Sequence, residues 1–128
     1  MTIMMSCLFI VALMPYLSKL VVAVAMSNEG AYDNNYPREQ QKRLTGFGAR
    51  AVAAHQNSFE ALLIFAVATL ACAVNQETGF FVQFLSVVFM LSRCGYHVAY
   101  LMNLATIRSM IWFIGFFSAM TMMVIAIP

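Results

Sequence analysis

The chain has 128 residues, of which 62% belong to the hydrophobic set and only 9% are charged. Soluble domains carry about a quarter charged residues, so this composition indicates a membrane protein. The net charge is +2 and no basic run is longer than Lys42-Arg43, which excludes the electrostatic surface of a nucleic-acid-binding protein.

The first apolar run covers about residues 2–26 and contains Pro15 and Lys19. It exceeds the apolar core of a secretory signal, which is about 7 to 15 residues, and no basic residue precedes Lys19. We therefore expect a first membrane span. Pro15 is tolerated in such a helix when neighbouring groups satisfy the backbone carbonyl that it leaves without a donor. Lys19 lies roughly 10 Å from the cytoplasmic end of that span, a distance its side chain can largely bridge by snorkelling.

The remaining chain alternates between polar connections and apolar runs. Residues 27–46, "SNEGAYDNNYPREQQKRLTG", are predicted to form a loop of about 20 residues, ordered by Tyr32 and Tyr36. Further spans are expected at about residues 47–74, 80–102 and 107–127, joined by the turns "NQETG" and "NLAT". The sequence thus predicts an all-α membrane protein, a bundle of four transmembrane helices in one domain over residues 1–128.

Basic residues predict the orientation of this bundle. Arg38, Lys42 and Arg43 lie in the first connection, Arg108 opens the fourth span, and the turn at residues 75–79 has no Lys or Arg. Short loops rich in Lys and Arg face the cytoplasm. Both termini are therefore expected outside the cytoplasm.

The three cysteines do not predict a disulfide framework or a metal site. Cys7, Cys72 and Cys94 are odd in number, lack Cys-x-x-Cys spacing and lie within apolar runs. We expect them to be small buried hydrophobic side chains, and we predict no metal ligands.

Polar residues inside the spans form two coherent faces. An intramembrane charge costs about 2.5 to 3.5 kcal/mol on insertion scales, so such residues usually mark a site. At about 100° per residue, each span presents its polar side chains on one side. These are Arg50, Gln56, Asn57 and Glu60 in the second span, and Arg93, Tyr96, His97 and Tyr100 in the third. His55 points elsewhere, and we expect it to form an interhelical hydrogen bond rather than to act as a base.

The charges on these faces indicate an anionic ligand in a cleft that opens to the cytoplasm. The alternative is a set of interhelical salt bridges, Glu60 with Arg50 or Arg93, that only holds the bundle together. One carboxylate does not neutralise these arginines together with Arg108. Glutathione carries two carboxylates, one ammonium and a thiol. Its carboxylates match the surplus of arginine charge, and its ammonium matches the single acidic residue.

Three ordered motifs resemble the MAPEG family, the membrane-associated proteins in eicosanoid and glutathione metabolism, and especially its bacterial members. They are Arg50 followed by "HQNSFE" (residues 55–60), "RCGYHVAY" (93–100), and the pair Arg108-Ser109. The resemblance implies a four-helix subunit of a homotrimer in a bacterial inner membrane. It also implies a glutathione transferase or peroxidase that acts on lipophilic electrophiles from the bilayer, with glutathione bound between subunits near the cytoplasmic side.

The same resemblance assigns roles to the residues that hold glutathione. Asn57 and Glu60 would hold its γ-glutamyl end. Arg50 and Arg93 would support its carboxylates or the surrounding network.

The resemblance also assigns the residues near the peptide and its sulfur. Tyr96 and Tyr100 would pack against the peptide and hydrogen-bond to it. Arg108, with Ser109 next to it, would stabilise the thiolate, because a guanidinium at a helix N-terminus lowers the pKa of a nearby thiol.

Departures from the family pattern leave a second reading open. Ala53 and Gln56 stand where glutathione-binding mammalian members often have Arg, so part of the carboxylate clamp is absent. A non-catalytic scaffold that binds lipid or glutathione would suit this weaker clamp. A small four-span exporter is disfavoured because the first span has no acidic residue.

Overall fold

The computed structural model describes all 128 residues as helices joined by short connections, with no strand. The helices are α1 (Thr2–Asn28), α2 (Pro37–Arg43), α3 (Gly46–Val74), α4 (Phe80–Leu101) and α5 (Ala105–Ile125). Of these, α1, α3, α4 and α5 are long and apolar enough to cross a membrane. The predicted all-α bundle with four membrane-spanning helices is confirmed.

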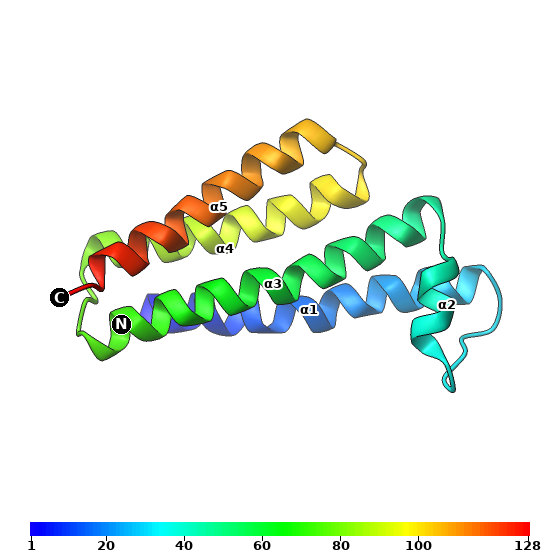
Figure 1. The fold of residues 1–128 in the computed structure, drawn as a ribbon, viewed down its shortest axis with the longest axis horizontal. Coiled ribbons are helices and arrows are strands. Elements are labelled where there is room, and N and C mark those ends of the chain that lie inside the picture. The colour runs from blue at the N-terminus through cyan, green and yellow to red at the C-terminus, as the bar shows by residue number, and fades with distance from the viewer.

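The long helices lie side by side in two pairs, α1 with α3 and α4 with α5 (Figure 1). The short α2 crosses one end of the α1–α3 pair, and both chain termini lie at the opposite end (Figure 1). The two pairs are close at the end with the termini and diverge toward the end with α2. The polar faces predicted from the sequence lie toward that diverging end.

The expected loop at residues 27–46 is wrong in its middle, because residues 37–43 form α2. Pro37 occupies the first turn, where its missing N–H has no helical partner to lose. Glu39 lies in the first turn and Lys42 and Arg43 in the last, which suits the helix dipole. Polarity alone therefore predicted a loop where the order of charges favours a short helix.

Gln40 anchors this segment to the bundle through its side-chain amide. Its Oε1 accepts the backbone N–H of Asp33 at 2.9 Å, and its Nε2 donates to the carbonyl oxygens of Met26 at 3.3 Å and Ala31 at 3.1 Å. The Asp33 carboxylate in turn accepts two backbone N–H groups of the turn that follows it. The order expected for this connection thus comes mainly from Gln40 and Asp33.

Gln40→Leu is expected to lower the free energy of unfolding by about 1 to 3 kcal/mol, because it leaves the buried carbonyl of Met26 and the partly buried N–H of Asp33 without a partner. Limited proteolysis would then cleave within residues 29–45 faster than in the wild type. Gln41→Leu, one residue away and without these bonds, is the matched control. Equal cleavage of both variants would contradict an anchoring role for Gln40.

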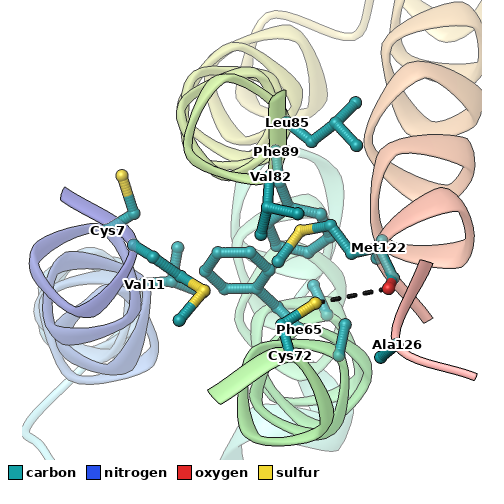
Figure 2. Close-up of a cluster of buried hydrophobic side chains, with 13 residues drawn as sticks. Cys7, Val11, Phe65, Cys72, Val82, Leu85, Phe89, Met122 and Ala126 are labelled. Carbon is teal, nitrogen blue, oxygen red and sulfur yellow. Dashed lines mark hydrogen bonds between the residues drawn. The ribbon is translucent and has the colours of Figure 1, made fainter. Parts of the chain in front are cut away.

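The largest core cluster fills the end of the bundle where the helix pairs are close (Figure 2). Figure 2 shows side chains from all four long helices meeting around Phe65 and Phe89, whose rings stack with centroids 4.3 Å apart. The Sγ of Cys72 donates to the carbonyl oxygen of Met122 at 3.3 Å. Tight packing here fixes the relative height of the helices and so positions the polar residues of the other half.

Two of the three cysteines are buried as predicted, and one is not. Cys7 and Cys72 belong to the core cluster, whereas Cys94 is exposed. The expectation of burial is wrong for Cys94 because, in a membrane span, an apolar neighbourhood in sequence fits a lipid-facing position as well as a core position.

Candidate functional site

The centre of the site is a short chain of hydrogen bonds from Arg93 to Glu60. Arg93 on α4 is only 5% exposed, and its Nη1 donates to Oδ1 of Asn57 on α3 at 3.3 Å. The Nδ2 of Asn57 donates to Oε2 of Glu60 at 3.1 Å. The spacing of three residues places Asn57 and Glu60 on one face of α3. An amide both accepts and donates, so Asn57 can join the cation to the carboxylate without direct contact between them.

The guanidinium of Arg93 is not fully satisfied by hydrogen bonds within the chain. Its Nε and Nη2 are buried and make no hydrogen bond. The ring centroid of Tyr96 lies 4.6 Å from its Cζ and that of Phe89 lies 5.7 Å away. The only ion pair in the chain joins Lys42 to Glu39. The chain therefore contains none of the salt bridges between Glu60 and an arginine that the alternative interpretation required.

Arg108 extends the site toward the end of the bundle that carries α2. Its Cζ lies 4.2 Å from the ring centroid of Tyr100, and the rings of Tyr100 and Tyr96 meet edge to face at 5.6 Å. Side chains are thus in continuous contact from Arg108 to Arg93. The hydroxyl of Ser109 donates to the carbonyl oxygen of Ala105 at 3.1 Å, within its own helix.

Two cavities flank this continuous row of side chains. A separate cavity, of about 580 Å³, lies elsewhere, between α2 and α3. The two that belong to the site share Trp112 as a wall. A cavity of about 50 Å³ touches Asn57, Glu60 and Arg93, and one of about 290 Å³ touches Tyr96, Arg108 and Ser109.

Arg50 lies at the rim rather than beside the bridging amide. Its Nε donates to the carbonyl oxygen of Leu101 at 3.4 Å, at the C-terminal end of α4. A positive charge there is favourable because helix-terminal carbonyls lack donors. Arg50 and Glu60 are separated along α3 by roughly 15 Å at 1.5 Å per residue.

His55 makes the interhelical contact predicted for it. Its Nδ1 lies 2.9 Å from the carbonyl oxygen of Pro15 on α1, and because a carbonyl only accepts, Nδ1 carries the proton. Its ring meets Phe59 edge to face at 5.3 Å. His55 therefore joins α1 to α3 and lies outside the chain of contacts around Arg93.

Comparison with known families decides the identity of this architecture. The model of the MAPEG family matches residues 3–128, almost the whole chain. The chain belongs to the MAPEG family. No curated protein and no solved structure matches it significantly.

In this MAPEG chain the structure brings most of the predicted site residues into one contact network. Asn57, Glu60 and Arg93 form its hydrogen-bonded part, and Tyr96, Tyr100 and Arg108 its aromatic and cationic part. Arg50 lies at the rim and Ser109 bonds to its own backbone. Sequence reasoning missed Phe116, which lines the smaller cavity, because α5 presents no polar stripe beyond Arg108 and Ser109 that would orient it.

Gly115 on α5 creates the space that the Arg93 side chain occupies. A Cβ at this position would collide with the Oγ of Ser92 and would lie 3.3 Å from both Nε and Nη2 of Arg93. Small residues in membrane spans often allow two helices to pack closely, and Gly115 does so here. In this MAPEG chain the close approach also sets the position of the buried guanidinium.

Gly115→Ala is expected to lower the free energy of unfolding by about 1 to 3 kcal/mol, because the added methyl overpacks the contact with Ser92 and Arg93. The matched control is Gly95→Ala, whose Cβ would meet only Ile111 at an ordinary 3.6 Å. Gly95→Ala should be neutral or stabilising by up to about 1 kcal/mol, since alanine favours helix. Thermal denaturation in detergent measures both, and equal midpoints would contradict the packing argument.

Proposed function

We propose that this MAPEG protein is a glutathione-dependent membrane enzyme that conjugates lipophilic electrophiles or reduces lipid hydroperoxides. The observation that supports it most strongly is the buried guanidinium of Arg93, which has two unpartnered nitrogens and is linked through Asn57 to Glu60. A buried cation without an anion is costly. An anionic ligand that brings its own ammonium would satisfy both Arg93 and Glu60.

Glutathione fits this set of groups. One of its carboxylates would accept from the free N–H groups of Arg93, and its ammonium would donate to Glu60. Charge-assisted hydrogen bonds of this kind are roughly twice as strong as neutral ones. The peptide would then extend along Tyr96 toward the larger cavity, where Arg108 stands in the first turn of α5.

Arg108 would stabilise the reacting sulfur. A thiol with a pKa near 8.5 is mostly protonated at neutral pH and is a weak nucleophile. The guanidinium of Arg108 and the free amides of the helix N-terminus favour the thiolate, and the proton leaves to water. In conjugation the sulfur forms a bond to the electrophilic carbon and the halide departs. In hydroperoxide reduction, two glutathione molecules become the disulfide while the hydroperoxide yields an alcohol and water.

The proposal includes a homotrimer in a bacterial inner membrane, with both termini outside the cytoplasm. The cavity beside Arg108 is bounded by residues of α4 and α5 alone, so a neighbouring subunit could close its outer side. The basic residues at the α2 end support the orientation, because Lys and Arg accumulate in cytoplasmic loops. A membrane location lets apolar substrates enter through lipid while glutathione enters from the cytoplasm.

A specific observation also favours the non-catalytic alternative, a scaffold that binds lipid or glutathione. The Ser109 hydroxyl is engaged with Ala105 rather than directed to a ligand, and Gln56 lines the separate cavity between α2 and α3. In that case the site would bind glutathione but leave its thiol unactivated.

Turnover by the purified protein distinguishes these functions. Glutathione would be supplied with 1-chloro-2,4-dinitrobenzene in one assay and cumene hydroperoxide in another. Conjugation or peroxide reduction above the rate without protein supports the enzyme, and the ratio of the two rates separates transferase from peroxidase. Binding of glutathione with no turnover in either assay would support the scaffold and overturn the enzymatic proposal.

A further inference from the structure

A second group of polar side chains lies between α1 and α4, away from the proposed glutathione site. It borders a cavity of about 330 Å³, which we refer to as the α1–α4 groove. Most of the lining consists of apolar side chains of α1 between Ile10 and Val21. The polar groups of the groove are the hydroxyl of Ser18, the thiol of Cys94 and the imidazole of His97. A mostly apolar cavity with a few convergent polar groups is the usual form of a small-molecule site.

Ser18 is the one buried serine whose hydroxyl has no partner. It is only 4% exposed, and its Oγ makes no hydrogen bond. The four other buried serines each donate to a carbonyl oxygen of their own helix, and they are Ser58, Ser86, Ser92 and Ser118. Burial of a hydroxyl without a partner is unfavourable, so nearly all such groups in proteins are satisfied. Because Ser18 lines the groove, a ligand there would supply the missing acceptor.

His97 is the second polar side chain of the groove without a partner. The helical periodicity of α4 grouped it with Arg93, Tyr96 and Tyr100, but His97 lines the α1–α4 groove and neither cavity of the proposed glutathione site. It is half-buried and forms no hydrogen bond within the chain, unlike His55. An ionisable side chain inside a membrane span is costly and usually has a binding function. The groove thus brings together two free hydrogen-bonding groups from two helices.

The polar groups lie at the end of the groove that is nearer to α2. Ser18 is about 15 Å from the end of α1, and His97 is about 6 Å from the end of α4, at 1.5 Å per residue. From Ser18 the apolar lining continues along α1 to Ile10, about 12 Å deeper in the span. The groove therefore complements a molecule with one polar head and one apolar chain that lies along the helices.

A carboxyl group fits the polar end of the groove. One of its oxygens accepts from the hydroxyl of Ser18, and the other shares a proton with a ring nitrogen of His97, whichever of the two groups carries that proton. The phosphate of a glycerophospholipid fits less well, because no Arg or Lys lines the groove and the polar end lies below the ends of both helices. A volume of about 330 Å³ is at the small end of the range for ligand cavities, which suits one chain rather than two.

Met14 and α4 itself separate the α1–α4 groove from the proposed glutathione site. Met14 lines the groove and also a void of about 10 Å³ beside Tyr96, which has room for one water at most. At about 100° per residue, the direction shared by Cys94 and Val98 in the groove is roughly 160° from that shared by Tyr96 and Tyr100. A neighbouring subunit that closes the cavity between α4 and α5 therefore lies across α4 from the groove.

We propose that the α1–α4 groove binds one long-chain fatty acid from the surrounding membrane. The carboxyl group lies between Ser18 and His97, and the chain extends along α1 toward Ile10. The ligand supplies the acceptor that the Ser18 hydroxyl lacks and the partner that the His97 ring lacks. Its binding does not require glutathione, so it stands or fails separately from the proposed enzymatic function.

Photochemical cross-linking of the full-length protein in detergent, with a palmitic acid that carries a diazirine in its chain, tests this proposal. Saturable cross-links, located by mass spectrometry, are expected within residues 10–21 and 94–98, and excess palmitic acid should abolish them. Ser18→Ala should weaken saturable labelling about fivefold, the usual effect of one hydrogen bond, and His97→Phe at least about tenfold, because a bond to a charged group is stronger. Ser118→Ala removes a buried hydroxyl from α5, outside the groove, and should label as the wild type does.

Four outcomes would overturn the proposal. Equal labelling of the wild type, Ser18→Ala and His97→Phe would indicate ordinary contact with lipid chains. Equally strong competition by methyl palmitate or by phosphatidylglycerol would exclude selection for a carboxyl group. Labelling that occurs only after the oligomer is dissociated would assign the groove to a contact between copies of the chain. Competition by glutathione would make the groove part of the glutathione site.

Discussion

Arg108→Ala is expected to lower kcat for the glutathione conjugation reaction by about 100- to 1,000-fold, the usual loss when one preorganised donor to a developing or bound anion is removed. The affinity for glutathione should change far less, because the carboxylates and the ammonium are held by Arg93 and Glu60. Arg108 contacts Tyr100 near the end of the bundle, so its removal leaves the main core intact. Steady-state kinetics with 1-chloro-2,4-dinitrobenzene, and glutathione titration of the same sample, measure the two quantities separately.

Two controls make this result specific to the reacting sulfur. Arg108→Lys keeps the charge and should retain part of the activity, and the pH at which activity is half-maximal should rise in Arg108→Ala because the thiolate loses its stabilising cation. Arg43→Ala removes an arginine on α2, remote from the row of contacts around Arg93, and should behave as wild type. Equal losses of kcat and affinity in Arg108→Ala would remove Arg108 from the chemical role.

Arg93→Met is expected to weaken glutathione binding by at least about 100-fold, since truncating one member of a buried, hydrogen-bonded charge pair costs about 2 to 5 kcal/mol. The same substitution should leave the stability of the ligand-free protein unchanged or raise it. The reason is that Met fills much of the volume and removes a guanidinium that has two unpartnered nitrogens. Loss of binding with retained stability separates a ligand-binding role from a structural one.

Glu60→Gln is the companion to this substitution, because it removes the charge that would pair with the ligand ammonium and keeps the bond from Asn57. It should weaken glutathione binding while binding of a ligand without the ammonium is less affected. Unaltered glutathione affinity in both Arg93→Met and Glu60→Gln would contradict the placement of the ligand at Asn57.

The sequence predicted the four membrane-spanning helices because hydropathy and length are direct requirements of a bilayer. It did not predict α2, since a seven-residue polar helix is stabilised by contacts such as those of Gln40 and Leu44 rather than by its own composition. Nor did it distinguish the exposed Cys94 from the buried Cys7 and Cys72. In lipid, apolar side chains occur on both sides of a span, so hydropathy does not identify the inner face.

Helical periodicity predicted which side chains share a face but not how they pair. The sequence predicted polar faces that carry Arg93 on one helix and Asn57 and Glu60 on another. A direct salt bridge between Glu60 and Arg93 was one interpretation of this pattern. The structure instead inserts the amide of Asn57 between the two charges, because its position relative to Glu60 and Arg93 depends on rotamers and on the height of the helices. The stacked pair Phe65 and Phe89, next to the site, helps to set that height.

The contribution of α5 could not be predicted in the same way. Arg108 and Trp112 are separated by one turn and stand near the site, but the rest of the helix carries no polar stripe to orient it. Gly115 becomes informative only when the space for its missing Cβ is seen to be taken by Ser92 and Arg93.

Glutathione-dependent thermal stabilisation of the detergent-purified protein, measured in parallel for wild type and Arg93→Met, tests the central claim most directly. A ligand at about 100 times its Kd stabilises the state that binds it by about 2.7 kcal/mol. We expect saturable stabilisation of the wild type at millimolar glutathione and none for Arg93→Met. Absence of stabilisation in the wild type, or equal stabilisation of both proteins, would contradict glutathione binding at the buried guanidinium of Arg93.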